Sequence, residues 1–215
     1  MTAFADRRAA GRALAERLAP LAGTDVVVLA LPRGGLPVAD EVARALGAPL
    51  DLVLVRKIGM PGNPELALGA IAGPGGQTMV LNEELVAAFG IDRDTIEAQA
   101  APQRVELERR RKLWGGRLAP GALRGKTVVL VDDGIATGAT MRAAIAAVRA
   151  DKPAQVIVAA PVAPPDVVAA METLADQVVC LYMPREFTAV GLHYASFPQL
   201  DDEEVRRILA AAPRT

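Results

Sequence analysis

The chain has 215 residues, 52% of them hydrophobic, so it is long and apolar enough to bury a substantial core within one domain. A net charge of −1 excludes the strongly basic surface that a general nucleic-acid binder needs, and we expect no DNA partner. One cysteine, Cys180, excludes an intramolecular disulfide, and one histidine, His193, excludes a metal site with several histidines. With no leader-like segment and no apolar run of about 18 residues, we expect a cytoplasmic protein that does not enter a membrane.

Apolar periodicity predicts the first elements in chain order. Residues 10–18 place their apolar side chains on one face of an opening helix. The run 26–31 (VVVLAL) is apolar without alternation, which predicts a strand buried on both faces, as in a parallel sheet. A helix over 37–46 and a second apolar strand over 50–55 follow.

The rest of the chain continues this alternation, with one interruption. The segments 66–72 and 77–81 flank a glycine-rich turn and predict a β-hairpin. A charged helical region over 82–118 follows, and its basic run 109–112 is predicted to be a solvated, ion-paired face. The later elements are expected as strands at 128–131, 154–160 and 177–182 and as helices from 141, over 167–174 and over 201–211. This order predicts a mostly parallel sheet covered by helices, with the charged region as an insertion beside it.

The most informative segment is 128–140, VVLVDDGIATGAT. Four apolar residues predict a buried strand that ends in Asp132 and Asp133, and a loop of small residues then leads into a helix. Ligands of open α/β sheets bind at the carboxyl ends of strands, and the free N–H groups that begin a helix suit phosphate. A pentose phosphate offers an anion to the loop and vicinal hydroxyls to the acids. An ordinary strand-to-helix junction, with Asp or Thr as N-cap, remains the alternative.

This string resembles the phosphoribosyl-diphosphate (PRPP) motif of type I phosphoribosyltransferases, and no Lys follows Gly138 as it would in a Walker A loop. The chain is most similar to a bacterial branch of that family that carries LPRGG, VRK, NPELALGAI and VDDGIATGAT. The resemblance extends over 26–197 and implies an α/β, Rossmann-like phosphoribosyltransferase fold with a parallel sheet. It also implies one domain over 1–215, with a helical insertion at about 82–120 and a small C-terminal hood at about 182–200.

The resemblance implies which residues bind each part of PRPP. It implies that Asp132 and Asp133 bind the ribose hydroxyls, and both are also expected to be catalytic. The residues expected to bind the 5-phosphate are Ala136, Thr137, Gly138, Ala139 and Thr140. Mg²⁺ is the expected cofactor, held mainly by PRPP and water, with Asp132 or Asp133 as the protein's candidate contact and no protein-only metal site.

Pyrophosphate needs cations and bare backbone, and the loop after the first strand offers both. Gly34 and Gly35 let a phosphate approach the main chain, and Arg33 supplies a forked guanidinium. The family often has a cis peptide in this loop, so we expect one within 31–33.

Arg56 and Lys57 follow the apolar strand 50–55 and are predicted to reach the same edge of the sheet and bind pyrophosphate, although an ordinary solvated strand end is the alternative. The breaker-rich loop 59–64 is expected to act as a lid. Together with the two aspartates, Arg33 and Lys57 are the expected catalytic residues.

The acceptor side is less defined. In the family, a hood over the base follows the last core strand, and Phe187 and Val190 are the candidates for base contact here, with a hydrophobic flap packed on the core as the alternative. Glu65 is a candidate for proton handling. Ala136 occupies a position where enzymes for 6-oxopurines commonly carry a carboxylate, and Gly134 replaces a bulky apolar residue.

These residues predict transfer of the 5-phosphoribosyl group from PRPP to a nitrogenous small-molecule acceptor, a base, with release of pyrophosphate. The setting expected is cytoplasmic nucleotide metabolism. A non-catalytic protein that binds PRPP or a nucleotide and regulates a partner is the alternative, and a sugar-phosphate hydrolase is a third possibility. The apolar hairpin is a candidate surface for a homodimer.

Overall fold

The computed structural model describes residues 3–73, 76–115 and 121–213. Its central sheet has five parallel strands in the order β2-β1-β6-β7-β8, and a second, antiparallel sheet has the order β3-β4-β5. The strands are β1 (Val26–Ala30), β2 (Leu50–Leu52), β3 (Val55–Met60), β4 (Asn63–Ala72), β5 (Thr78–Leu81), β6 (Thr127–Val131), β7 (Gln155–Val162) and β8 (Gln177–Tyr182). The helices are α1 (Arg7–Leu18), α2 (Gly35–Leu46), α3 (Glu83–Ala88), α4 (Arg93–Trp114), α5 (Ala139–Ala150), α6 (Pro165–Glu172) and α7 (Asp202–Ala211), with short 3₁₀ turns at Ala19–Leu21 and Val190–His193.

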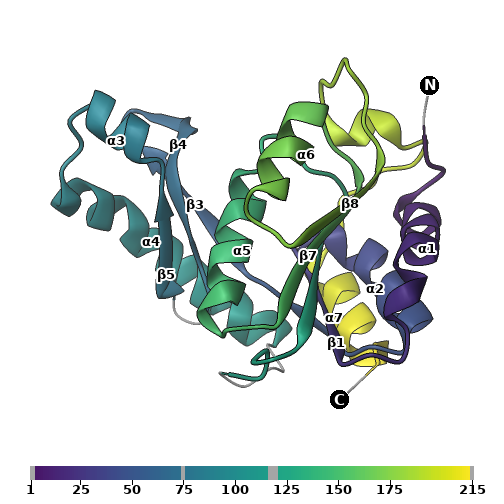
Figure 1. Cartoon of the computed structure of the whole chain (residues 1–215). Coiled ribbons are helices and arrows are strands. Elements are labelled where there is room, and N and C mark those ends of the chain that lie inside the picture. The colour runs from purple at the N-terminus through teal and green to yellow at the C-terminus, as the bar shows by residue number, and fades with distance from the viewer. Residues whose placement is uncertain (1–2, 74–75, 116–120, 214–215) are drawn as a thin grey trace.

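Helices cover both faces of the central sheet, which confirms the predicted fold class (Figure 1). Alternate side chains of β1 pack into two hydrophobic cores, one on each face of the sheet, because successive side chains of a strand point to opposite faces. Val26 and Val28 pack with α1, α2 and α7, whereas Val27 and Leu29 pack with α5 and α6. Both cores therefore hold β1 and β6 in place at the centre of the sheet. Within the described ranges no helix has the length and apolar character needed to cross a membrane.

The prediction of one strand over 50–55 is wrong. Strand β2 ends at Leu52, and the chain then leaves the central sheet to form β3, which pairs with β4. Met60 pairs with Asn63, so the segment 59–64 is the tight end of a hairpin, and its role as a lid stays a prediction. Arg56 and Lys57 consequently lie within β3 instead of at the edge of the parallel sheet.

The helical insertion is confirmed for its described part, whereas residues 116–120 lie outside the described ranges. Helices α3 and α4 pack on the small sheet around Ile58, Leu68, Ile71 and Leu107. This body stands beside α5, at the left of Figure 1, and the other face of the small sheet packs on α5 through Ala70 and Ala143.

A close crossing of α1 and α2 gives the first testable prediction. A Cβ atom added to Gly11 would lie 2.7 Å from the carbonyl oxygen of Val38 and 2.9 Å from Cβ of Glu41. Helix propensity alone would make Gly11→Ala stabilising by about 1 kcal/mol. We expect the clash to reverse that sign, so urea denaturation should show a loss of roughly 1–3 kcal/mol.

Arg12→Ala is the matched control, because the side chain of the next residue is 61% exposed. It should change the free energy of unfolding by no more than about 0.5 kcal/mol. A Gly11→Ala variant more stable than the wild type would contradict the packing described here.

Candidate functional site

The loops that follow β1 and β6 meet at the carboxyl edge of the parallel sheet. The Leu31 amide donates to the carbonyl oxygen of Val131 at 2.9 Å. A Cβ atom on Gly34 would clash with the carboxyl group of Asp133, and one on Gly35 would lie 2.6 Å from the Val131 oxygen. The two glycines therefore let the two predicted motifs touch.

The peptide bond between Pro32 and Arg33 is cis. It lies within the predicted window 31–33, on the bond that follows the proline. Gly35 then donates its amide to the Leu31 oxygen at 3.1 Å, so the loop turns tightly into α2.

The loop after β6 leaves the N-terminus of α5 open. Gly138 precedes the helix with a φ of +78°, a conformation that favours glycine, and no side chain of the described residues caps this end. The four other residues predicted to bind the 5-phosphate are exposed around it, namely Ala136, Thr137, Ala139 and Thr140. Exposed amides at the positive end of a helix dipole are suited to an anion.

The two aspartates have different environments. The Asp133 carboxylate accepts a hydrogen bond from Nε of Arg7 at 2.7 Å, and both side chains are buried. The hydroxyl of Tyr194 donates to the Asp133 carbonyl oxygen at 2.5 Å. The Asp132 carboxyl group accepts the amide of Asp133 at 2.9 Å, interacts with the Asp133 carboxyl group and lies beside Gly35, and no cation among the described residues forms an ion pair with it. Asp132 is thus the acid better placed for a ligand.

Burial raises the pKa of the Asp132 carboxyl well above its usual range, and the neighbouring Asp133 carboxylate raises it further. Burial also raises the pKa of Asp133, although the hydrogen bond and charge of Arg7 act in the opposite direction. The pKa of Tyr194 is raised by burial and then by the charge of Asp133. The site therefore favours the protonated form of Asp132, which has no ion-pair partner among the described residues, and keeps the Asp133 carboxylate beside Arg7.

The Arg33 guanidinium contacts the segment that begins α7, and its role in binding pyrophosphate stays a prediction. One of its nitrogens donates to the Leu200 oxygen at 3.0 Å and another lies 3.0 Å from Asp202. The guanidinium also lies 5.7 Å from the ring centre of Trp114. These partners at the start of α7 satisfy its charge, so only the backbone of the loop faces Asp132 and Asp133.

Arg56 and Lys57 point to opposite faces of β3, so the predicted basic pair is split. Arg56 donates twice to Oε1 of Gln103 on α4, at 3.1 and 2.9 Å, and burial lowers its pKa. Lys57 is exposed and shares the α5-facing side of β3 with Val55. Of the two, Lys57 alone keeps a geometry compatible with the predicted role.

The hood, residues 182–200, packs against the loop after β6. Phe187 stacks on His193 with ring centres 5.4 Å apart. A Cβ atom on Gly134 would lie 2.5 Å from Val190, which explains why a bulky residue is absent there. Phe187 and Val190 are partly buried in this arrangement, and their contact with a base stays a prediction. Glu65 lies in β4, and nothing tests its predicted role.

Arg7 and Tyr194 are the residues that sequence analysis missed. A signal for Arg7 was present, because it falls on the same helical face as Ala10, Leu14 and Leu18, and a charge on a buried face needs a partner. For Tyr194 the only signal in the sequence was that it belongs to an aromatic-rich segment.

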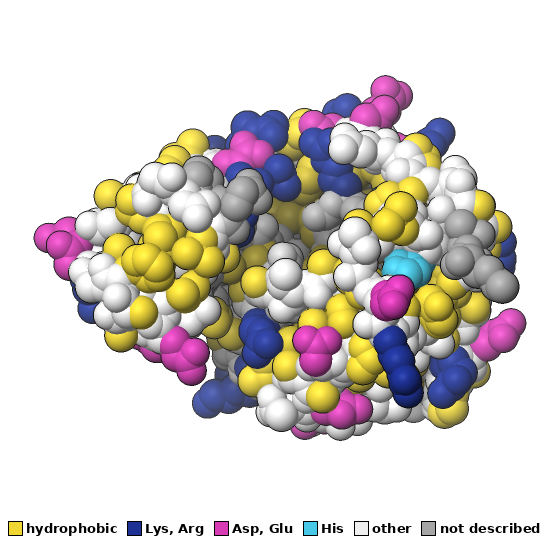
Figure 2. Space-filling view, turned by 90° about the horizontal axis from the view of Figure 1, so that it is seen from above, with side chains coloured by type: hydrophobic (Ala, Val, Ile, Leu, Met, Phe, Trp, Pro, Cys, Tyr) yellow, Lys and Arg dark blue, Asp and Glu magenta, His cyan; other side chains and the backbone are white. Residues whose placement is uncertain are grey.

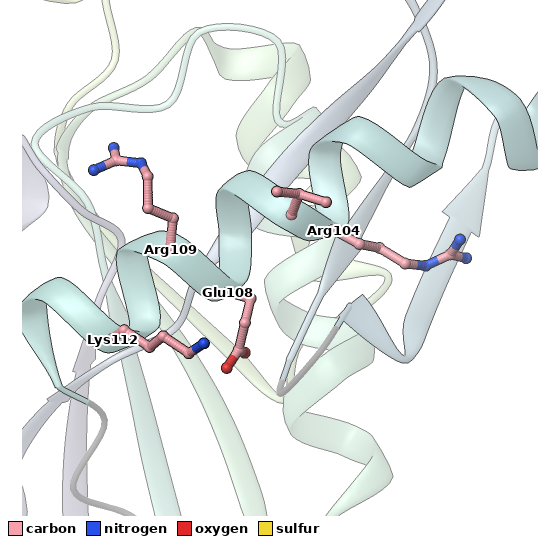
Figure 3. A pocket seen from close by; sticks show the side chains of 5 residues that line it. Arg104, Glu108, Arg109 and Lys112 are labelled. Atoms are coloured by element: carbon pink, nitrogen blue, oxygen red, sulfur yellow. The ribbon is translucent and has the colours of Figure 1, made fainter.

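The basic run of α4 is the ion-paired surface predicted for it. Glu106 pairs with Arg109 and Arg110, which lowers its pKa to about 2, and Glu108 pairs with Arg111. Figure 3 shows a shallow depression whose lining side chains all extend from this one helix. No other element in the described part of the chain contributes a lining side chain. The depression therefore lacks the groups from several elements that a binding site needs.

Figure 2 views the molecule from above, looking onto the carboxyl ends of the parallel strands. This face is hollowed between the body that carries the small sheet and the main body with its hood. The open end of α5 belongs to this face, since α5 follows β6 directly.

Asp132 and Asp133 should respond oppositely to replacement by asparagine. Because the pKa of Asp132 is higher in the folded chain, stability falls as pH rises from about 4 through the folded pKa. Asp132→Asn keeps the acceptor for the Asp133 amide and removes the charge, so the unfolding midpoint at neutral pH should rise by roughly 2–4 °C. This advantage should shrink as the pH is lowered toward 4.

Asp133→Asn is the matched substitution one residue later. It leaves the buried guanidinium of Arg7 without its carboxylate, and such a loss costs roughly 3–5 kcal/mol. Differential scanning calorimetry of both variants across pH tests the pair. Equal shifts of the same sign would contradict the division between the two acids.

Comparison with known proteins identifies the family of the chain. The phosphoribosyl transferase domain model matches residues 4–194. Two Mycobacterium tuberculosis proteins, from strains H37Rv and CDC 1551 and each named "Putative phosphoribosyl transferase", are 48% identical over 214 residues. The match covers 100% of this chain and 48% of theirs, so the chain spans about half the length of these curated relatives.

A crystal structure of TT1426 from Thermus thermophilus superposes with a TM-score of 0.81 at 48% identity and covers 97% of this chain and 98% of its own. The family match and these relatives show that the chain belongs to the phosphoribosyl transferase domain family.

Proposed function

We propose that the chain transfers the 5-phosphoribosyl group of PRPP to a nitrogenous acceptor and releases pyrophosphate. The observation that carries this proposal is the junction of β6 and α5. There, the carboxyl group of Asp132, which forms no ion pair among the described residues, stands between an open helix N-terminus and a glycine loop. These three features match the hydroxyls, the 5-phosphate and the pyrophosphate of one ligand.

In this proposal the 5-phosphate lies at the start of α5. The amides of 136–140 donate to its oxygens, and the hydroxyls of Thr137 and Thr140 add two further donors. Hydrogen bonds to a charged group contribute roughly 1.5–3 kcal/mol each. Three or four of them would hold the sugar phosphate while its ring rests against the strand end.

Asp132 accepts from the ribose hydroxyls. Asp133, which was predicted to share this task, instead supports Asp132 through its amide and is held by Arg7. The loop of Gly34 and Gly35 lies beside the two aspartates and receives the pyrophosphate, with the amide of Gly34 as its proposed donor, since the amide of Gly35 already donates to the Leu31 oxygen. Lys57, on the α5-facing side of β3, is the cation proposed for the leaving group.

Mg²⁺ is the proposed cofactor. Among the described residues no group of three or more His, Cys, Asp or Glu side chains is arranged to hold a metal. An ion that arrives on pyrophosphate oxygens and needs one protein carboxylate fits Asp132. When bound, it would neutralise charge on the departing pyrophosphate.

The protein's contribution to the reaction is then positional and electrostatic. Displacement of pyrophosphate from C1 by a ring nitrogen passes through an oxocarbenium-like state. Asp132 and the amides at α5 fix the ribose, while the glycine loop stabilises the charge that develops on the leaving group. The hood would exclude water from C1, with Phe187 and Val190 as its proposed acceptor contacts.

The proposal for the acceptor class rests on one position of the loop after β6. Ala136 offers no carboxylate to a 6-oxopurine, so we propose a different nitrogenous base, used in cytoplasmic nucleotide metabolism. A homodimer formed through the hairpin of β4 and β5 is proposed with it. Binding of PRPP without turnover would identify the regulatory alternative.

The test measures pyrophosphate release from PRPP and Mg²⁺ with a panel of purines, pyrimidines, nicotinate, orotate and amines. We expect release that requires both Mg²⁺ and one acceptor class. Asp132→Asn should lower the rate by about 10²-fold or more, the cost of losing one charged transition-state contact.

Asp25→Asn is the control, because this exposed carboxylate lies just before β1, at the opposite edge of the sheet, and pairs with Lys126. It should leave the rate unchanged. Full activity of Asp132→Asn would refute the proposal, whereas release without any acceptor would indicate a hydrolase.

A further inference from the structure

A buried arginine that sequence analysis did not identify joins three parts of the molecule at one point. Nε of Arg7 donates to the Asp133 carboxylate at 2.7 Å, and Nη1 donates to the Pro198 carbonyl oxygen at 2.6 Å. Its guanidinium carbon lies 3.6 Å from the centre of the Phe197 ring. The side chain is 9% exposed, so helix α1, the PRPP motif and the hood share one desolvated cation.

The segment before Arg7 reinforces the same attachment. The amides of Ala3 and Phe4 donate to the His193 oxygen at 2.9 and 3.0 Å. In return, the amides of Ala195 and Ser196 donate to the oxygens of Phe4 and Ala5, both at 2.9 Å. We call residues 3–7 the strap, because they run along the hood and end at Arg7.

A continuous series of contacts leads from the sugar site to the strap. The Asp132 carboxylate accepts the amide of Asp133, whose own carboxylate holds Arg7. The backbone carbonyl oxygen of Asp133 also accepts a hydrogen bond from the hydroxyl of Tyr194, which lies inside the hood. A ligand that fixes Asp132 therefore restrains the backbone of Asp133, and Arg7 and Tyr194 carry that restraint into the hood.

We propose that Arg7 is a positioning residue that couples occupation of the PRPP site to ordering of the hood. The coupling rests on the proposed function, because it needs a ligand at Asp132. Arg7 contacts no reacting atom in this scheme. It holds Asp133 away from the sugar, so that Asp132 alone meets the hydroxyls, and it holds residues 197–198 against the loop after β6.

Arginine is suited to this position for a physical reason. Its planar fork places separate donors on a carboxylate and a carbonyl while its face rests on an aromatic ring. A lysine would keep the charge opposite Asp133 but has one ammonium to share between those partners. Arg7→Lys should therefore retain part of the coupling and Arg7→Met none.

The experiment follows amide hydrogen exchange of Ala195 and Ser196 by NMR, with and without PRPP and Mg²⁺. In the wild type we expect PRPP to slow exchange of both amides by about tenfold, which corresponds to about 1.4 kcal/mol. In Arg7→Met the same ligand should change their exchange by less than about twofold. Its Kd for PRPP, from calorimetry, should stay within about threefold of the wild-type value, because the ligand's own contacts are intact.

Two variants separate coupling from simple loss of structure. Arg8→Met removes the adjacent arginine, which pairs with Asp40 and Glu41 and has a side chain that is 46% exposed. It should leave the PRPP-dependent slowing intact. Asp132→Asn should lose PRPP binding while the two amides keep their ligand-free exchange rates.

Each result has one meaning. The coupling would be overturned if PRPP slowed amide exchange in Arg7→Met as much as in the wild type. It would also be overturned if Arg7→Met lost as much PRPP affinity as Asp132→Asn while amide exchange in its hood was no faster. If Arg7→Met does not fold, Arg7→Lys and Phe197→Leu carry the comparison, and unchanged slowing in both would also overturn it. If the wild type binds no PRPP, the proposed function fails, and the coupling fails with it unless ribose 5-phosphate with Mg²⁺ slows the same amides.

Discussion

The site depends on a backbone contact that only glycine permits. Where the loop after β1 reaches the end of β6, Gly34 faces the carboxyl group of Asp133, and Gly35 faces the Val131 carbonyl. Any side chain at either position would separate the two loops, which the proposed function places on one ligand. This constraint explains why a glycine pair follows the first strand and an acid pair follows the sixth, although about 100 residues lie between them.

Local sequence patterns were sufficient for the central sheet and its ligand edge. Strands β1 and β6 are short apolar runs buried on both faces, and the segment after β6 has the composition of an anion-binding turn. These features follow from residues within a few positions of one another. The predicted fold class and the open end of α5 could therefore be obtained from the sequence.

What the sequence could not supply was the partner of each charged side chain. Arg33 finds Leu200 at a separation of 167 residues, and Arg7 finds Asp133 at a separation of 126. Such partners are set by the packing of whole elements, which periodicity does not encode. The break after Leu52 was missed for a similar reason, because the apolar residues 53–55 suit either sheet and only pairing with β4 decides between them.

The unequal treatment of the two aspartates indicates how stability and ligand binding are balanced. Asp133 has a cation, and Arg7 offsets part of the cost of its burial, although desolvation still raises its pKa. Asp132 has none, and its raised pKa records free energy that folding spends on keeping a carboxylate at the sheet edge. In the function that we propose, hydroxyl donors or a magnesium ion would pair with Asp132, and that free energy would return as affinity. The burial that makes Asp132 destabilising would then also be the source of its affinity for a sugar.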